Sequence, residues 1–384
     1  MSDLAQRLEG MRVVVCAGSG GVGKTTTSAA IAMGLAARGA RVCVVTIDPA
    51  RRLADALGIE QLGSEPRRVD DERFAGHGIV IGDGGELWAM MLDPKRTFDE
   101  LIAKLAPDDK TRDDILENRI YRELSSAVAG SQEFTAVAKL YDLNRSGMFD
   151  VIVLDTPPSR NALDFLDAPD RLTGFLEGRA LRLFLAPSGL AARVVGRGTG
   201  VVFGVLRRVT GVDLMNDLSV FFGALSGVLD GFRERAAGVK ALLADPATTF
   251  LIITSPERDP VEEAIFFRGK LREAGMPFGG LVVNRVHPLA PGGDDVDTAA
   301  VTEELGGDAA LARKVVRTLE EFRLLARRDA GALERLAREV GDDDPIVVPH
   351  LDGDVHDVDG LVLVHRHLFA DGPARAEMLS EAAF

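Results

Sequence analysis

Short apolar runs, rich in β-branched residues, alternate along this chain with longer stretches in which apolar and polar residues mix at helical spacing. The runs show little alternation with polar residues, which is typical of strands buried on both faces. Because strands alternate with helices, the pattern predicts βαβ units: an α/β fold with a mostly parallel central sheet flanked by helices. The predicted strands cover residues 12–16, 41–47, 87–92, 149–154, 250–254, 280–283 and 346–348.

Two stretches depart from this alternation, residues 95–145 and residues 170–245, and both are helical in composition. They predict a helical subdomain inserted within a single domain that covers residues 1–384. The second stretch is unusually apolar, although none of its runs is long enough to span a bilayer. Either it packs on itself or it offers a hydrophobic groove to a client or subunit, and the sequence leaves both open. Residues 372–384 are expected to form a flexible tail.

The first predicted strand leads into a glycine-rich loop with the sequence Gly-Ser-Gly-Gly-Val-Gly-Lys-Thr, residues 18–25. A predicted helix follows, ending near Gly39. This spacing matches the phosphate-binding G-x-x-x-x-G-K-[ST] motif in its strand–loop–helix context. Glycines let successive backbone N–H groups face one anion, and the helix N-terminus adds its positive dipole end. Lys24 could reach the β- and γ-phosphates of a nucleotide, and the Thr25 hydroxyl could ligate Mg²⁺.

Two aspartates follow other predicted strands. Asp48 comes just after residues 41–47, where a carboxylate could orient and deprotonate an attacking water. Asp155 ends the run Val-Ile-Val-Leu-Asp, the Walker-B arrangement that puts a carboxylate beside Mg²⁺. Many strand-end aspartates merely cap helices, but with the phosphate loop these two indicate nucleotide hydrolysis.

Composition narrows the function further. The formal net charge of −14 disfavours non-specific binding to nucleic acid or anionic membranes. Cys16 and Cys43, the two cysteines, lie in predicted strands and are expected to be core residues. No C-x-x-C occurs, which argues against a cysteine-built metal, arsenite or iron–sulfur site. Without a leader-like or membrane-spanning segment, we expect a cytoplasmic protein that is not integral to a membrane.

The chain resembles the arsenite-pump ATPase (ArsA) family, which includes the cytosolic ATPase that targets tail-anchored membrane proteins. The resemblance, strongest to an actinobacterial branch, rests on the phosphate loop, on Asp48-Pro49-Ala50, on Asp155 to Pro169 and on Val-Val-Asn-Arg ending at Arg285. It implies a P-loop NTPase of the deviant Walker A type that uses ATP and Mg²⁺ and forms dimers with nucleotide at the interface. The implied catalytic residues are Asp48 and Lys24, and the implied metal ligands are Thr25 and Asp155. The implied nucleotide contacts are Gly20, Gly21, Val22, Gly23, Lys24, Thr25, Thr26, Asn284 (to adenine) and Pro349 (in a loop over the base).

Departures from the family pattern bear on the partner. The family's loop normally carries a second lysine, which reaches the phosphates of the partner subunit, and here that position is Ser19. Arg51 stands where the family usually has histidine. We therefore expect a heterodimer with a lysine-bearing paralogue, with a homodimer as the alternative. Two further functions stay open: a regulatory subunit that holds ATP but turns over little, and a chaperone-like carrier of hydrophobic segments.

Overall fold

The computed structural model describes residues 4–382 apart from positions 49, 120, 123–131, 158–219, 222, 290–296, 352, 354 and 356. The chain divides into two compact units, which we call the sheet unit and the helical unit. The sheet unit comprises Met1–Met90, Met148–Ala162 and Pro246–Phe384. The helical unit comprises Met91–Gly147 and Leu163–Asp245. Their division resembles the expected inserted subdomain, whose bounds of 95–145 and 170–245 stay a prediction.

An eight-stranded sheet in the order β3-β4-β2-β5-β1-β6-β7-β8 forms the centre of the sheet unit. The pairings of β1 with β5 and β6, of β2 with β5, of β6 with β7 and of β7 with β8 are parallel, whereas β3 and β4 are antiparallel. The predicted mostly parallel α/β architecture is thereby confirmed. The strands are β1 Val13–Ala17, β2 Arg41–Thr46, β3 Arg67–Arg68, β4 Glu86–Met91, β5 Val151–Asp155, β6 Thr248–Thr254, β7 Phe278–Val286 and β8 Ile346–Pro349.

Apolar composition explains the central strands, because β1, β5 and β6 are buried at every position. All seven strands expected from the apolar runs are present within a few residues of their predicted bounds. The sequence missed β3, whose two arginines are both exposed and give no apolar signal.

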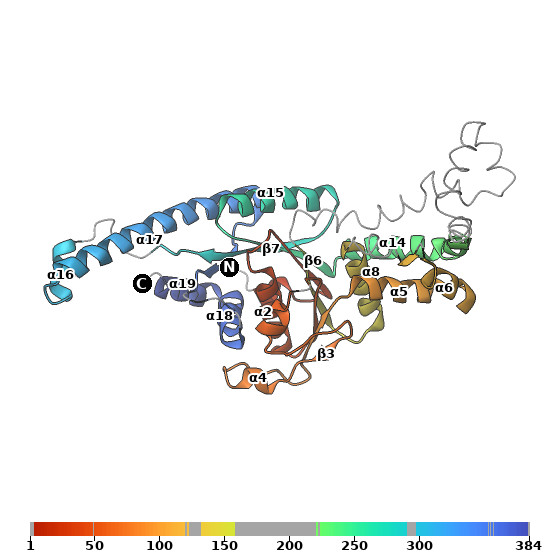
Figure 1. Ribbon diagram of the computed structural model, residues 1–384. Coiled ribbons are helices and arrows are strands. Elements are labelled where there is room, and N and C mark those ends of the chain that lie inside the picture. The colour runs from red at the N-terminus through yellow and green to blue at the C-terminus, as the bar shows by residue number, and fades with distance from the viewer. Residues whose placement is uncertain are drawn as a thin grey trace. The chain divides into compact units, whose positions relative to one another are not determined.

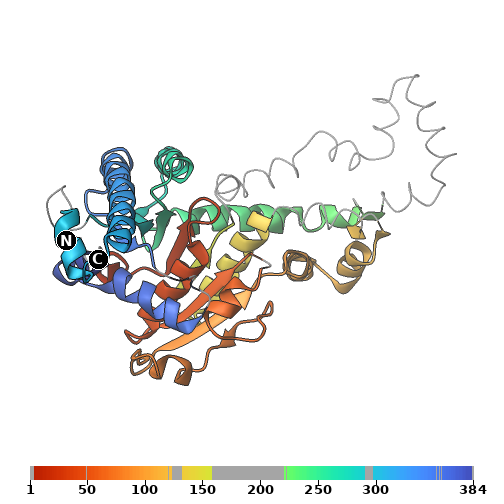
Figure 2. The same cartoon turned by 60° about the vertical axis from the view of Figure 1, so that its left-hand side comes forward.

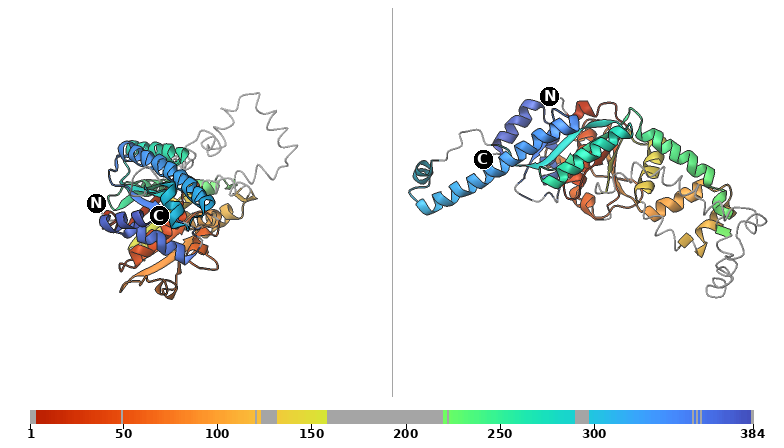
Figure 3. Two further views of the ribbon diagram at one scale, coloured as in Figure 1. Left: turned by 90° about the vertical axis from the view of Figure 1, so that its left-hand side faces the viewer. Right: turned by 90° about the horizontal axis from the view of Figure 1, so that it is seen from above.

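Helices cover both faces of this sheet. On one face α2 contacts β1, β2 and β5 and lies against α18, as Figure 2 shows. On the other, α15 contacts β6 and runs beside the long α17 (Figures 1 and 3). The helices of this unit are α1 Leu4–Arg7, α2 Lys24–Ala36, α3 Arg52–Ala56, α4 Glu72–Ala75, α15 Arg258–Glu273, α16 Thr298–Glu304, α17 Ala309–Leu336, the π-helix η2 Ala337–Gly341, α18 Val358–Phe369 and α19 Gly372–Glu381.

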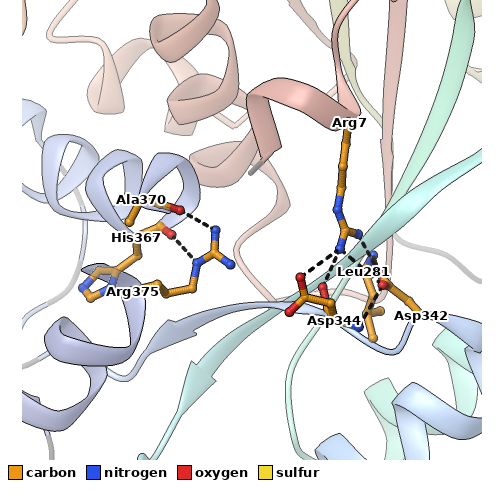
Figure 4. Close-up of polar contacts among 7 residues, drawn as sticks. All are labelled: Arg7, Leu281, Asp342, Asp344, His367, Ala370 and Arg375. Atoms are coloured by element: carbon orange, nitrogen blue, oxygen red, sulfur yellow. Dashed lines mark hydrogen bonds and ion pairs between the residues drawn. The ribbon is translucent and has the colours of Figure 1, made fainter. Parts of the chain in front are cut away.

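The two ends of the described chain are tied to the sheet unit by buried or half-buried arginines (Figure 4). Arg7 of α1 donates to the Asp342 carboxylate at 2.8 Å, and the same carboxylate accepts the Leu281 N–H of β7. Arg375 of α19 is 3% exposed and donates to the backbone oxygens of His367 and Ala370 at the end of α18. The segment expected to be a flexible tail thus contains a helix whose arginine satisfies the last carbonyls of its neighbour.

The described part of the helical unit consists of α5 Pro94–Leu105, α6 Asp109–Leu116, α8 Gln132–Ser146 and α14 Leu229–Leu243. Its largely aliphatic core contains an aromatic cluster, in which the Phe98 ring lies 5.7 Å from that of Phe232 and 6.3 Å from that of Tyr121. Most of residues 170–245, including Phe222, falls outside the described residues. Within the described ranges of the whole chain, no helix is both long and apolar enough to cross a bilayer.

Candidate functional site

The phosphate loop joins the end of β1 to the start of α2 and needs glycine at several places, among them Gly21 with φ +81°. A side chain on Gly18 would collide with the backbone oxygen of Ile253 in β6, 1.8 Å from the ideal Cβ position. Gly23 has φ +90°, and a Cβ there would meet the Asn284 amide. Gly23 is also the N-cap of α2 and provides no capping side chain. The first N–H groups of α2 are therefore left for an anion, which is the arrangement that binds phosphate.

Lys24, the first residue of α2, is only 7% exposed. Its ammonium group donates to the backbone oxygen of Ser19 at 2.7 Å, across the turn of the loop. Burial lowers the pKa of Lys24, and the charges of Asp155 and Asp48 oppose that change. A cation held in this position can attract the terminal phosphates of a nucleotide.

Asp155 lies at the carboxyl end of β5, where two threonines converge on it. Its Oδ2 accepts hydrogen bonds from the Thr25 hydroxyl at 2.7 Å and the Thr46 hydroxyl at 2.8 Å. Its Oδ1 is buried and has no hydrogen-bond partner among the described residues. Burial raises the pKa of Asp155 to about 6, although the two hydroxyls and the charge of Lys24 act against that rise.

An orphaned buried carboxylate oxygen beside the loop's threonine is a suitable ligand for a divalent cation. Oxygen ligands from one or two side chains, completed by water and phosphate oxygens, are what Mg²⁺ takes in nucleotide sites. The Thr25 hydroxyl donates to Asp155 Oδ2, so the two side chains are neighbours, and Asp155 Oδ1 is the oxygen left for a cation. The two predicted metal ligands are therefore adjacent and chemically suited to Mg²⁺.

Asp48 follows β2 and lies at the same edge of the sheet. Its N–H donates to the Thr46 hydroxyl at 3.2 Å, and its Oδ1 accepts the Ala50 N–H at 2.9 Å. Its Oδ2 lies 3.7 Å from Nη1 of Arg52 in α3. The charge of Asp48 acts on both Lys24 and Asp155. All three predicted charged residues are thus within electrostatic range of one another.

Asn284 and Pro349 lie on β7 and β8. The Asn284 amide donates to the Val22 oxygen of the phosphate loop at 2.9 Å, and its own oxygen accepts the N–H of Arg285. Arg285 has φ +60°, which is rare outside glycine, and sits where the pairing of β7 with β8 shifts register. Pro349 is buried and pairs with Val286. Asn284 therefore contacts the loop directly, while Pro349 lies one strand further out.

The remaining predicted loop residues differ in exposure: Gly20 and Gly21 are exposed, Val22 is buried, and Thr26 is half-buried. Sequence reasoning missed Thr46 and Arg52. Thr46 links Asp48 to Asp155 through its hydroxyl, and the signal for it was a polar residue at the end of an otherwise apolar strand. Arg52 was hidden because its importance depends on which way its side chain points.

The features described so far define a class of protein. A glycine loop between a strand and a helix, a buried lysine and a strand-end aspartate bonded to the loop's threonine are the parts of a P-loop nucleoside triphosphatase. These parts stand at the carboxyl edge of a mostly parallel sheet, beside β1, where ligands of such sheets bind.

Comparison with known proteins identifies the family. Residues 11–296 match the ArsA family of anion-transporting ATPases, and the chain belongs to this family of ATPases. It is 27% identical to ATPase ARSA1 of Chlamydomonas reinhardtii over 287 residues, covering 70% of this chain but 34% of the relative. It is 26% identical to ATPase GET3 of Malassezia globosa over 283 residues (73% of this chain, 75% of the relative). It is 27% identical to ATPase ARSA2 of Chlamydomonas reinhardtii over 296 residues (76% and 72%). The chain thus spans about a third of ARSA1 and about three quarters of this GET3.

Proposed function

We propose that this chain hydrolyses ATP with Mg²⁺ and uses the reaction to drive a conformational cycle of a dimer. Membership of the ATPase family supports the reaction class. The observation that carries the assignment to this site is the convergence of Thr25 and Thr46 on Asp155, whose second oxygen is buried without a partner among the described residues. That arrangement suits a divalent cation placed next to the terminal phosphates.

In this proposal the phosphate loop, from Gly20 to Thr26, surrounds the phosphates with backbone N–H groups. Lys24 gives up its hydrogen bond to the Ser19 backbone oxygen, and its ammonium group then contacts the β- and γ-phosphates. Mg²⁺, when bound, neutralises charge on the phosphate oxygens, with Thr25 and Asp155 as its protein ligands. Asn284 reads adenine, for which its amide keeps one N–H and one oxygen lone pair beyond its bonds to Val22 and Arg285, and the loop beginning at Pro349 covers the base.

The chemical step needs an oriented water. The water oxygen attacks the γ-phosphorus, the bond from that phosphorus to the β–γ bridging oxygen breaks, and ADP departs with the bridging oxygen. Asp48 orients the water and accepts its proton, which passes on to phosphate or solvent. The Asp48 carboxylate suits this role because it stands past β2 at the same sheet edge, within electrostatic range of Lys24 and Asp155.

The site lacks a cation at position 19. Ser19 is 6% exposed, and its hydroxyl has no hydrogen-bond partner in the described part of the chain. A chain with serine there can receive a lysine from a partner but cannot supply one. In a homodimer both sites would lack this charge at the developing transition state. We therefore propose a heterodimer with a paralogous subunit that keeps its lysine, in which the site of this chain is the complete one.

The test compares turnover of the isolated chain with turnover in the presence of the paralogue. We expect low ATPase activity alone, a rise on addition of the paralogue, and partial recovery in Ser19→Lys alone. Ser19→Ala is the matched control, since it removes the hydroxyl without adding charge. Full-speed hydrolysis by the single chain, with no response to any partner, would refute the heterodimer. If the chain is instead a regulatory subunit that only holds ATP, neither the paralogue nor Ser19→Lys raises hydrolysis at this site.

A second candidate function is that of a carrier of hydrophobic segments, and the similarity to ATPases named GET3 supports it. The apolar stretch 170–245 would provide its groove. Phe221 is 6% exposed and lies against Tyr121, which favours a core role for that residue. Binding of a fluorescent apolar peptide, with and without nucleotide, would test this candidate directly.

A further inference from the structure

We propose that Arg52 is the residue by which this site distinguishes ATP from ADP, a cation supplied in cis that binds the γ-phosphate and thereby frees Asp48. The inference rests on the proposed function, because it assumes that the phosphate loop binds a nucleotide. Beyond that function, the inference names a residue that sets nucleotide specificity, and it has the Arg52 guanidinium exchange the Asp48 carboxylate for the γ-phosphate.

Arg52 and Asp48 form a loose, partly exposed ion pair just after β2. Nη1 of Arg52 lies 3.7 Å from Oδ2 of Asp48, and the two side chains are 68% and 33% exposed. The other carboxylate oxygen of Asp48 accepts the Ala50 N–H. Both carboxylate oxygens of Asp48, the proposed base, therefore have a partner. If Arg52 moved to a phosphate, Oδ2 of Asp48 would become free to bind the attacking water.

Through its contact with Asp48, the guanidinium group stands at the same carboxyl edge of the sheet as the phosphate loop. The field of Arg52 adds to the larger effect of burial in lowering the pKa of Lys24. A γ-phosphate placed beside Lys24 would then lie in the field of Arg52 as well. Phosphate oxygens offer a guanidinium group more negative charge than a single carboxylate and can bind it through two parallel hydrogen bonds.

The neighbouring arginine provides a contrast. Arg51 stands next to Arg52 in sequence but donates to the backbone oxygen of Glu60. Position 19, the family's usual source of an extra cation, holds an uncharged serine. Arg52 is thus the side chain that combines contact with Asp48 and a field at Lys24. A highly exposed arginine in a weak pair can exchange partners at little free-energy cost.

Binding measurements on the isolated chain test the inference without relying on turnover. Affinities for Mg·ADP and for Mg with a non-hydrolysable ATP analogue are measured by calorimetry for wild type, Arg52→Ala, Arg52→Lys and Arg51→Ala. We expect wild type to prefer the ATP analogue. Arg52→Ala should weaken the analogue at least about tenfold while leaving ADP affinity within about twofold. Arg52→Lys should keep part of the preference, and Arg51→Ala should match wild type.

Three outcomes overturn the inference: no preference for the ATP analogue in wild type, an unchanged preference in Arg52→Ala, or equal weakening of both nucleotides, which would mean that Arg52 only supports the loop after β2. Lys24→Ala separates these failures from failure of the proposed function. If Lys24→Ala binds both nucleotides as wild type does, the phosphate site itself is misassigned, whatever Arg52 does.

Discussion

The two ends of helix α2 both bury ionisable side chains, but they treat charge in opposite ways. At its N-terminus Lys24 and Asp155 are buried close together, and burial raises the pKa of Asp155 only to about 6, so the carboxylate is ionised at neutral pH. At its C-terminal end α2 lies against α18, where burial lowers the pKa of His365 to about 4. That imidazole is neutral at neutral pH.

The difference separates a binding site from a core. Both ends contain buried polar atoms without hydrogen-bond partners in the described chain: Oδ1 of Asp155, and both ring nitrogens of His365. A neutral ring can give up hydrogen bonds at moderate cost, whereas a buried carboxylate that keeps its charge is expensive unless something pairs with it. The charged end therefore needs a ligand to be complete, and the neutral end does not.

The largest expected effect comes from removing the buried cation at the charged end. Lys24→Ala should abolish measurable Mg·ATP binding, because Lys24 would make charged hydrogen bonds to both the β- and γ-phosphates and each contributes about 1.5–3 kcal/mol. Calorimetry at several nucleotide concentrations measures the loss. We expect the far-ultraviolet circular dichroism to stay that of the folded protein.

Lys139→Ala is the control for Lys24→Ala. Lys139 is also buried, 9% exposed, but it pairs with Glu100 in the helical unit. It should lose stability and keep nucleotide affinity. Unchanged affinity in Lys24→Ala would end the assignment of the phosphate loop.

The next effect separates binding from chemistry at the same end. Asp48→Asn should keep ATP affinity within a few-fold and lose roughly 10²–10⁴-fold in turnover, because only the transition state uses the carboxylate as a base. Single-turnover hydrolysis together with nucleotide affinity distinguishes the two. Turnover within about twofold of wild type would move the base to another residue.

The two ends of α2 also differ in how many of their important residues can be predicted from the sequence. The phosphate loop, Asp48 and Asp155 are visible in the sequence because each follows an apolar run at a fixed spacing. Arg52 is not, since its role depends on side-chain direction after β2, and Thr46 gives only the weak signal of a polar residue at the end of that strand. Nothing in the sequence separates His365 from a ligand, because its neutrality results from burial and from the charges of Arg38 and Arg366.

The pH dependence of stability sharpens the comparison because the two shifts have opposite signs. The pKa of Asp155 rises from 3.8 to about 6 on folding, so its contribution to stability is present below 3.8 and is lost as pH rises through about 6. The pKa of His365 falls from 6.5 to about 4, so its contribution is present above 6.5 and is lost as pH falls through about 4. Each is worth roughly 3 kcal/mol, and in wild type they largely offset each other between pH 4 and 6.5.

Replacing either His365 or Asp155 should reveal the pH dependence of stability that the other residue contributes. His365→Leu should gain up to roughly 3 kcal/mol relative to wild type as pH falls from 7 to 4. Urea unfolding of the nucleotide-free protein at pH 7.0, 5.5 and 4.5 measures the gain. Asp155→Asn should show the opposite trend and become relatively less stable in acid. If His365→Leu and wild type had parallel pH profiles, His365 would not be held neutral by its surroundings.

The smallest expected effect tests whether the C-terminal end of α2 is only a packing contact. A Cβ on Gly34 would lie 2.2 Å from the Phe369 ring, which also has the Arg38 guanidinium 4.3 Å from its centre. Gly34→Ala gains about 1 kcal/mol in helix propensity but overpacks this contact by about 1–3 kcal/mol, so we expect a net loss of roughly 1 kcal/mol. Because the clash is with a side chain, adding Phe369→Leu should make the Gly34→Ala change less harmful than it is in wild type. Nucleotide affinity should stay within twofold in both variants, and a larger change would mean that the α2–α18 contact is coupled to the phosphate loop at the other end of the helix.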